Sequence, residues 1–354
     1  MSLLFDEIMQ QPNVLDGIKR KNKEKFVQIA DEFRNLGLDS IYFVARGTSD
    51  HACIYAQYLF AICGGIPCTL GTPSAVSKYG AEIKFSNTAV IGVSQSGKAE
   101  DVLSVIRQAN AQGKLTVAVT NDEDSPLAKE AKYHLFCNAG DEKSIAATKT
   151  FTSQMYILAQ LCAEITKNET LPALLDKVPL ALGSMLSYIP ASVAKICERY
   201  RYLDSAFVLG RGMTYPIALE GALKILETNK IRMKGNAISD FYHGPLAQVE
   251  EDSLVIVLAA EGPVYDDSIA MIERLHEIGA EVFATPGCES NVKEIFDKTW
   301  ELKQDPTMMI FNQFAEMGNP LWHYNVTGEA LATVYETVKR EGDRLAGCAF
   351  TSGS

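Results

Sequence analysis

The sequence lacks the residue patterns of several specialised classes of protein. Its 354 residues contain eight cysteines but no Cys-x-x-Cys pair, and five histidines but no His-x-x-x-His pair. A disulfide framework and a cysteine or histidine metal centre are therefore not expected, and we interpret most of the cysteines as buried free thiols. Acidic residues (44) outnumber basic residues (33), which gives a net charge of −11. A chain of this charge is not expected to bind nucleic acid or an anionic membrane.

Long hydrophobic runs are also scarce. We find no apolar run that approaches the ~20 residues of a membrane span, and the N-terminal residues do not have the order of a secretory signal. We therefore expect a cytoplasmic protein. Apolar residues make up 47% and charged residues 22% of the chain, which is average for a globular protein. The length exceeds the ~250–300 residues at which a single core stops growing, so two domains are expected.

Short apolar runs alternate with helical patterns along the chain, as in an α/β fold. The run SIYFVARG at 40–47 precedes one helical stretch, and TAVIGVSQSG at 88–97 precedes another. Because these strands are continuously apolar, the sequence predicts parallel sheets with helices on both faces, a three-layer αβα arrangement. Further strands are expected at 115–122, 133–140, 205–212, 253–262 and 281–287, and helices at 100–112, 148–166, 215–229 and 266–278.

These patterns divide the chain into five segments. The run SAFVLGRG at 205–212 resembles the run at 40–47, which indicates an internal duplication with a period near 165 residues and two halves that share one fold. A helical stretch with three prolines lies between the halves and is expected to connect them. The expected segments are a helical arm at 1–36, a first αβα domain at 37–167, a connector at 168–203, a second αβα domain at 204–345 and a tail at 346–354.

Small hydroxyl residues follow two strands of the first half, where such sheets bind ligands. Gly47-Thr48-Ser49 follows the first strand, and Ser94-Gln95-Ser96-Gly97 follows the third and leads into a helix. Hydroxyl groups, backbone N–H groups and the positive end of a helix dipole together suit phosphate, although serines here could also act only as helix caps. The corresponding loop of the second half, 259–263, has no hydroxyl and carries an acid. Only the first half is therefore expected to bind phosphate.

The loop EKSIAATKT at 142–150 opens the long helix of the first half. Two interpretations stay open for it. It is either an ordinary helix start that Thr148 or Ser144 caps, or a loop that contacts the ligand.

One helix of the second half carries side chains suited to catalysis. Glu220, Lys224 and Glu227 fall on one stripe of the helix at 215–229, which faces either water or a cavity. The stripe is either a solvated ion pair or a carboxylate base beside a group that polarises a carbonyl. His243 follows this helix in a loop with glycine and proline, next to an acid.

Together these loops resemble a known family. The segments ARGTSDHA, VSQSG, AGDEKSIAATKTF, LGRG, YPIALEGALK and HGPLA occur in this order within about residues 1–290. Their order and spacing resemble those of the tandem sugar-isomerase (SIS) domain proteins. Within that family the chain is similar to the isomerase half of glucosamine-6-phosphate synthase and to the type II glucosamine-6-phosphate deaminases. The variants that begin at Arg46 and Ala146 look more like the deaminase branch.

The resemblance implies two flavodoxin-like domains in a homodimer that acts on a 6-phosphorylated sugar or aminosugar without a metal or redox cofactor. It also implies roles for individual residues. Ser94, Gln95 and Ser96 would hold the phosphate. Glu227 would move a proton between C1 and C2, with Lys224 and Glu220 beside it. His243 would open the sugar ring in the active site of the neighbouring subunit. The other residues of the expected binding site are Gly47, Thr48, Ser49, Gly97, Lys98, Ile145, Ala147 and Thr148.

The chain departs from the family's pattern at three points. Ala99 stands where the family usually has a hydroxyl residue that touches phosphate, so we expect phosphate binding either to depend on Lys98 or to be weaker. Ala147 replaces a serine of the synthase loop, which removes a hydrogen bond to the sugar. The family's C-terminal lysine, which can form an imine with the ketose, has no recognisable counterpart at 339–354. Either Lys224 or Lys339 replaces it, or no imine forms.

The sequence therefore predicts an enzyme that converts glucosamine 6-phosphate into fructose 6-phosphate and ammonia. The chain begins Met-Ser-Leu-Leu and its first cysteine is Cys53, so an amidotransferase domain is not expected. Release of ammonia or an amine, or simple isomerisation, is favoured. The alternatives within the enzymes are a fructosamine-6-phosphate deglycase and a glutaminase-free aldose–ketose isomerase. The alternative from another class is a SIS-type sensor, which would have no need of the stripe on helix 215–229 or of His243.

Overall fold

The structure is a computed structural model that describes residues 2–250 and 253–286. Most of the expected C-terminal part of the second domain, the tail at 346–354, Lys339, Cys288 and Cys348 lie outside the described residues. The fold that follows is that of the described part of the chain.

Five parallel strands form the first sheet, in the order β2-β1-β3-β4-β5. β1 and β3 are neighbours, with Ile41 opposite Ala89 and Val44 opposite Gly92. This is the strand order of a flavodoxin-like sheet, in which a crevice opens between the carboxyl ends of β1 and β3. The strands are β1 (Ser40–Val44), β2 (Cys68–Leu70), β3 (Thr88–Val93), β4 (Thr116–Thr120) and β5 (Tyr133–Phe136).

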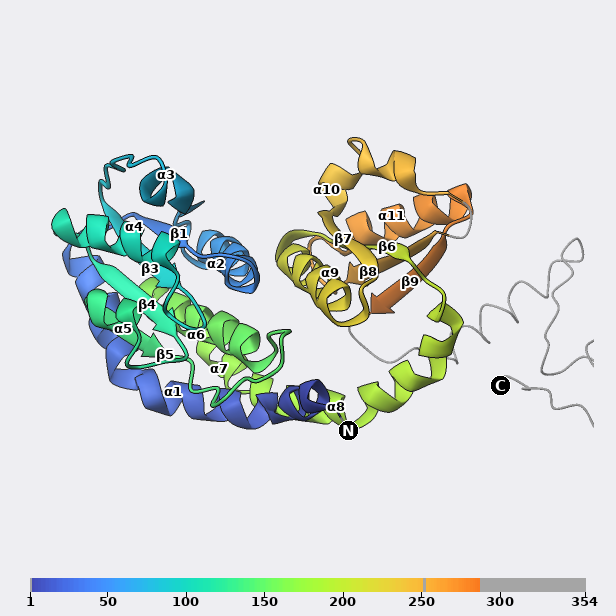
Figure 1. Cartoon of the computed structure of the whole chain (residues 1–354), viewed down its shortest axis with the longest axis horizontal. Helices are drawn as coiled ribbons and strands as arrows, with labels where there is room; N and C mark the ends of the chain where they lie inside the picture. Colours follow the sequence, from blue (N-terminus) through green and yellow to red (C-terminus); the bar gives the residue numbers. More distant parts are fainter. Residues whose placement is uncertain (1, 251–252, 287–354) are drawn as a thin grey trace, which may run out of the picture. The chain divides into compact units, whose positions relative to one another are not determined.

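Helices cover both faces of this sheet (Figure 1). On one face α1, α2 and α6 bury a core that includes Phe60 and Ile157. On the other face α4 and α5 bury side chains such as Ile106 and Leu127. The three-layer αβα prediction is confirmed. The helices are α1 (Leu3–Asn35), α2 (Thr48–Gly64), α3 (Pro73–Ser77), α4 (Glu100–Ala111), α5 (Pro126–Glu130) and α6 (Lys149–Thr166).

The N-terminal helix α1, expected as an arm, packs against the first domain. Its side chains Ile18 and Ile29 are almost completely buried in the core. Near its start, Glu7 accepts hydrogen bonds from the backbone N–H groups of Lys143 (2.6 Å) and Ser144 (3.2 Å). Burial alone would raise the pKa of Glu7, but these hydrogen bonds outweigh it and hold the pKa below its ordinary value. An ionised carboxylate on α1 therefore anchors the loop at 142–150.

The connector between the two halves contains an exposed apolar helix. It is formed by α7 (Leu171–Leu175), α8 (Val178–Ile196) and the 3₁₀ turn η1 (Cys197–Tyr200). The stretch Leu171–Tyr200 is long and apolar enough to cross a membrane by length and composition, and little of it is buried. The prediction that no apolar run approaches this length is wrong for this stretch, because its few charged residues lie near its ends. Length and composition alone do not make it a membrane span.

Four parallel strands of the second half form another sheet, in the order β7-β6-β8-β9. This order repeats that of the first four strands of the first sheet, and β6 begins 165 residues after β1, at Ser205 against Ser40. The predicted duplication is confirmed for these strands. The elements are β6 (Ser205–Gly210), η2 (Gly212–Thr214), α9 (Tyr215–Asn229), β7 (Arg232–Ala237), α10 (Ile238–Phe241), η3 (Pro245–Gln248), β8 (Leu254–Ala259), α11 (Tyr265–Ile278) and β9 (Glu281–Pro286).

Strand β7 was not predicted from the sequence. Its residues RMKGNA alternate between polar side chains and apolar or small ones, but the run is short, contains a glycine and has no β-branched or aromatic residue. Among the described strands β7 pairs only with β6, and Arg232 and Lys234 are exposed. Gly235 explains how this strand lies beneath α9. A Cβ atom added at Gly235 would lie 2.7 Å from the Leu219 Cα atom and 2.8 Å from the Ala218 carbonyl oxygen, both in α9. Only a residue without a side chain permits this close approach of strand and helix.

Gly235→Ala should lower the free energy of unfolding by ~1–3 kcal/mol, because the added methyl group meets helix backbone that cannot rotate away. Chemical denaturation of the purified protein measures the change. Gly221→Ala on α9 is the matched control, since an added Cβ there has no atom within 4 Å. Alanine favours a helix interior over glycine by ~0.5–1 kcal/mol, so the control should be more stable than the wild type. Equal stability of the two variants would contradict the close packing of α9 on β7.

Candidate active site

The loops that follow β1 and β3 meet at the carboxyl edge of the first sheet. Gly47 is the N-terminal cap residue of α2, so Thr48 and Ser49 lie in the first turn of that helix. The loop Ser94–Gly97 leads from β3 toward α4, whose cap residue is Ala99. Because β1 and β3 are adjacent, the two sets of hydroxyl groups face one crevice, at the topological switch point of the sheet.

Hydrogen bonds within the loop after β3 fix its shape. Ser94 Oγ accepts a hydrogen bond from the Gly97 N–H (3.2 Å), and Ser96 Oγ accepts one from the Lys98 N–H (3.3 Å). Gly97 has a φ of +61°, and a Cβ atom there would collide with Ser125 and Thr120. Glycine is required at this position both for its backbone angle and for the close approach of the neighbouring loop.

A cavity of about 250 Å³ lies at this edge. Its size is at the lower end of the range for small-molecule sites and suits a single small metabolite. Most of its lining is polar or small. The lining residues are Arg46, Thr48, Ser49, Val93, Ser94, Gln95, Ser96, Ala99, Val102, Ile145, Ala147, Lys224 and Glu227.

Most of the predicted site residues therefore come together, but not all. Gly47, Gly97 and Thr148 belong to the same loops without lining the cavity, and Lys98 is exposed and outside the lining. Glu220 lies behind the lining residues from α9 and is described below. His243 is exposed and does not line this cavity. Its backbone N–H donates to the Asp240 carbonyl oxygen at 3.0 Å.

The charged stripe of α9 faces the cavity. Lys224 Nζ lies 2.6 Å from Glu227 Oε2 and 3.2 Å from Glu220 Oε1. The side chains of Lys224 and Glu227 are 21% and 27% exposed, and that of Glu220 is 5% exposed. The stripe is thus an ion-pair cluster in a partly desolvated site, not a pair on a solvated helix surface. A carboxylate and an ammonium group beside one cavity provide a base and a group that can polarise or condense with a carbonyl.

His51 is a polar residue of this cluster that sequence reasoning missed. Its Nδ1 atom lies 2.7 Å from Glu220 Oε2, so an Nδ1–H donates to the carboxylate. Thr48 Oγ1 donates to Glu220 Oε1 at 3.0 Å and accepts from Lys224 Nζ at 3.2 Å. Glu220 is therefore held by His51, Thr48 and Lys224, which satisfies a buried carboxylate that would otherwise be costly. In the sequence, the one feature that could have indicated this role is the position of His51 three residues after Thr48, which places both on the same face of α2.

Glu142 is a second missed residue. Its Oε1 atom accepts hydrogen bonds from the N–H and the hydroxyl of Thr148, both at 2.9 Å. Its Oε2 atom accepts from the Thr150 hydroxyl and, at 3.4 Å, from Gln95 Nε2. Thr148 occupies the cap position of α6 but its side chain makes no capping bond. The interpretation of Thr148 or Ser144 as the cap is wrong, because the carboxylate of Glu142 takes the donors at this helix start.

Arg46 is the third missed residue. It follows β1 and lines the cavity. Its Nε and Nη2 atoms donate to Asp101 Oδ2 at 3.1 and 2.8 Å, and Nη2 also donates to Ser74 Oγ. A hydrogen bond from Ser77 and the pairing with Arg46 hold the pKa of Asp101 below its ordinary value. The carboxylate of Asp101 therefore holds Arg46 beside the cavity.

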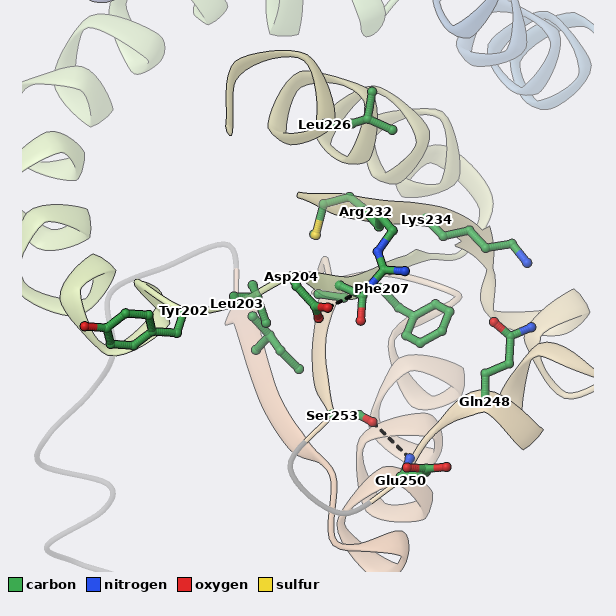
Figure 2. A pocket seen from close by; sticks show the side chains of 14 residues that line it. Tyr202, Leu203, Asp204, Phe207, Leu226, Arg232, Lys234, Gln248, Glu250 and Ser253 are labelled. Atoms are coloured by element: carbon green, nitrogen blue, oxygen red, sulfur yellow. Dashed lines mark hydrogen bonds and ion pairs between the residues drawn. The ribbon is translucent and has the colours of Figure 1, made fainter. Parts of the chain in front are cut away.

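A larger cavity of about 730 Å³ lies elsewhere in the second half (Figure 2). It is lined by residues at the amino ends of β6, β7 and β8, including Ser205, Arg232 and Leu254. Arg232 Nη2 donates to Asp204 Oδ2 at 2.6 Å across its wall (Figure 2). Parallel sheets bind ligands at the carboxyl ends of their strands. Despite its greater volume, this cavity is therefore not the candidate active site.

The described residues contain no group of three or more His, Cys, Asp or Glu side chains placed to hold a metal ion. The cysteines in this part of the chain are free. Cys53, Cys137 and Cys162 are buried, Cys63 and Cys68 are half-buried, and Cys197 is exposed. Burial raises the pKa of Cys68 to about 12, so this thiol is not poised to act as a nucleophile.

Relatives of known name share both sequence and fold with this chain. The isomerizing glutamine–fructose-6-phosphate aminotransferase of Methanothermobacter thermautotrophicus is 32% identical over 280 residues, which are 79% of this chain and 46% of that protein. The chain thus spans about half the length of such relatives. A solved structure from Silicibacter pomeroyi, provisionally described as a phosphosugar isomerase, has a TM-score of 0.75 at 31% identity and covers 81% of this chain and 87% of that one.

A glucosamine-6-phosphate deaminase from Thermotoga maritima has a TM-score of 0.63 at 22% identity, covering 80% of this chain and 85% of that one, and this likeness is one of fold. The family model described as the SIS domain matches two segments, residues 38–163 and 202–284. These segments contain the two parallel sheets, β1 to β5 and β6 to β9. The matched segments and the repeated strand order both indicate that each half is one SIS domain. The chain belongs to the SIS domain family, with two such domains in tandem.

Proposed function

We propose that this protein converts glucosamine 6-phosphate into fructose 6-phosphate and ammonia. The observation that carries the proposal is the position of Lys224 and Glu227, which form an ion pair at 2.6 Å and line the same cavity as the loop Ser94–Ser96. An anion-binding loop and a base beside one small cavity are the two requirements for moving a proton on a phosphorylated sugar. The phosphosugar isomerase description of the Silicibacter pomeroyi relative also supports this class of substrate.

The reaction divides into two proton movements and a hydrolysis. Glu227 removes the proton from C2 of the open-chain aminosugar and returns it to C1. The C1 oxygen takes up a proton and the nitrogen gives one up, so that the C1 aldehyde becomes an alcohol and the C2 amine becomes an imine. Water then adds to the C2 imine, and ammonia leaves as the C2 ketone forms. Lys224 stabilises the negative charge that develops on the C1 oxygen during the first transfer. Binding of the phosphate by Ser94, Gln95 and Ser96 would place C1 and C2 beside Glu227.

Residues outside the cavity lining support this geometry. Glu220 holds the ammonium group of Lys224 on one side while Glu227 contacts it on the other. His51 and Thr48 fix Glu220 in turn. Glu142 joins the loop at 142–150 to Gln95, so that the loops carrying Ile145, Ala147 and the phosphate-binding side chains keep one arrangement. Glu220, His51 and Glu142, which lie outside the lining, are positioning residues in the proposal, since each acts through another side chain.

The ring-opening step requires a second chain in this proposal. His243 is exposed and does not line the cavity of its own chain. We therefore place it in the active site of a partner subunit of a cytoplasmic homodimer, where its imidazole would protonate the ring oxygen as the sugar opens.

Three other reactions or roles fit parts of the same site. A fructosamine-6-phosphate deglycase and a simple aldose–ketose isomerase would use the same proton transfer, so the leaving amine is the distinguishing observation. A sensor would bind the sugar phosphate without turnover and would not need the Lys224–Glu227 pair. Incubation with a panel of 6-phosphorylated aminosugars and fructosamines, followed by measurement of ammonia and ketose phosphate, separates these cases. Release of both products in equal amounts from glucosamine 6-phosphate is expected, and release from none of the panel would contradict the proposal.

Glu227→Gln should lower kcat ~10²–10⁴-fold, because glutamine keeps the shape of the side chain but cannot accept the proton. KM should change little, since the phosphate contacts lie on other residues. Steady-state kinetics with glucosamine 6-phosphate measure both constants. Glu273→Gln, an exposed carboxylate on α11, makes the same chemical change away from the cavity and serves as the control. Near wild-type kcat in Glu227→Gln would remove this residue from the mechanism and leave Glu220 as the next candidate.

The proposed role of His243 in the active site of the partner subunit is tested by mixing two inactive variants. If Glu227→Gln and His243→Ala chains exchange subunits, a mixed dimer has one site with both defects and one site with neither. At equal mixing about half of the dimers are mixed, so about a quarter of the wild-type activity should return. Each variant alone, taken through the same exchange procedure, is the control. Exchange demonstrated by mass spectrometry without any return of activity would exclude a site shared between two chains.

A further inference from the structure

The charge of the phosphate group is not balanced by the loop that would bind it. Ser94, Gln95 and Ser96 offer neutral donors, and Ala99, the cap residue of α4, has no hydroxyl group to add. The first turn of α4 also carries two acids, Glu100 and Asp101, which oppose an anion at the helix start. A sugar phosphate is nearly a dianion at neutral pH, so a cation is needed at this end of the cavity.

Two cationic side chains line the cavity, Lys224 and Arg46. The ammonium group of Lys224 is already held between Glu220 and Glu227. Lys98, the residue expected from the sequence to compensate for Ala99, is exposed and outside the lining. Arg46 therefore remains as the cation within reach of the phosphate-binding loop.

The contacts of Arg46 leave one nitrogen of its guanidinium group, Nη1, available. Nε and Nη2 donate to Asp101 Oδ2, and Nη2 also donates to Ser74 Oγ. Nη1 makes no hydrogen bond to the described residues. Asp101 is itself fixed by the Ser77 hydroxyl at 2.5 Å. Nε and both hydrogens of Nη2 are thus engaged, and Nη1 can donate its two hydrogens to an anion without giving up these contacts.

We propose that Arg46 binds the phosphate group of the substrate through Nη1 of its guanidinium group, while Asp101 and Ser74 hold Nε and Nη2. The inference rests on the proposed function, because it assigns a contact for the same phosphorylated sugar. Arg46 replaces the hydroxyl contact that is missing at Ala99 and neutralises the carboxylate of Asp101 near the anion. Arg46 is therefore a substrate-binding residue, and Asp101, Ser74 and Ser77 position it.

Binding of inorganic phosphate tests this contact independently of catalysis. Arg46→Gln should raise the dissociation constant of phosphate ~10–100-fold, the size expected for a lost charge-assisted hydrogen bond pair. KM for glucosamine 6-phosphate should rise by a similar factor, with a smaller change in kcat, since the phosphate contact persists in the transition state. Titration calorimetry and steady-state kinetics measure these values. Arg107→Gln is the matched control, because Arg107 is a half-exposed arginine of α4 that pairs with Glu100 and Glu130 outside the cavity.

Arg46→Lys gives a second measurement and covers failure of Arg46→Gln to fold. Lysine keeps the charge, but its single ammonium group cannot bind Asp101 and the anion through separate nitrogens as a guanidinium group can. A several-fold weaker phosphate affinity is therefore expected. An unchanged phosphate affinity in either folded Arg46 variant would overturn the inference, as would a larger loss in Lys98→Gln than in Arg46→Gln. In those cases wild-type binding of phosphate still supports the proposed function. If the wild type binds neither inorganic phosphate nor any phosphorylated sugar, both proposals fail.

Discussion

The ammonium group of Lys224 lies between two carboxylates and donates to the hydroxyl of Thr48, and the candidate site depends on this set of contacts. Lys224, Glu220 and Glu227 come from α9 of the second domain, whereas Thr48 comes from α2 of the first. Glu220 is 4% exposed, and a carboxylate buried to this extent is stable only with partners such as His51, Thr48 and Lys224. The same contacts that satisfy Glu220 aim the ammonium group at the cavity. The contacts that stabilise the buried carboxylate of Glu220 are therefore the same contacts that position the ammonium group of Lys224.

The two halves of the chain share a strand order but contribute different chemistry. In the first half, the loops after β1 and β3 carry Thr48, Ser49, Ser94 and Ser96, with Arg46 at their side. In the second half, the loop after β8 has no hydroxyl residue at 259–263, and the useful groups lie instead on α9. In the proposed function, the first copy of the flavodoxin-like sheet binds the anion and the second presents the base. This division explains why a single cavity requires both halves.

The parts of the fold that the sequence predicted are those with strong local patterns. β1, β3 and α9 have clear apolar periodicity, and the predicted limits of α9, 215–229, agree with the structure. β7 was missed because its alternation runs over only six residues, without a β-branched or aromatic side chain and with Gly235, which the approach of α9 requires. The site residues were predicted where a loop motif carried them, as for Thr48 and Ser94. His51, Glu142 and Arg46 were missed because their roles arise from contacts with residues far away in the sequence, namely Glu220, Gln95 and Asp101.

The central claim is that this cavity moves a proton between two carbons of a sugar phosphate. Incubation of glucosamine 6-phosphate with the protein in D₂O, followed by NMR spectroscopy of C1 and C2, measures that transfer directly. The account predicts that the wild type incorporates deuterium at carbon and that Glu227→Gln does so far more slowly. Binding of the sugar phosphate without any incorporation of deuterium would contradict the account and would assign the site to recognition alone.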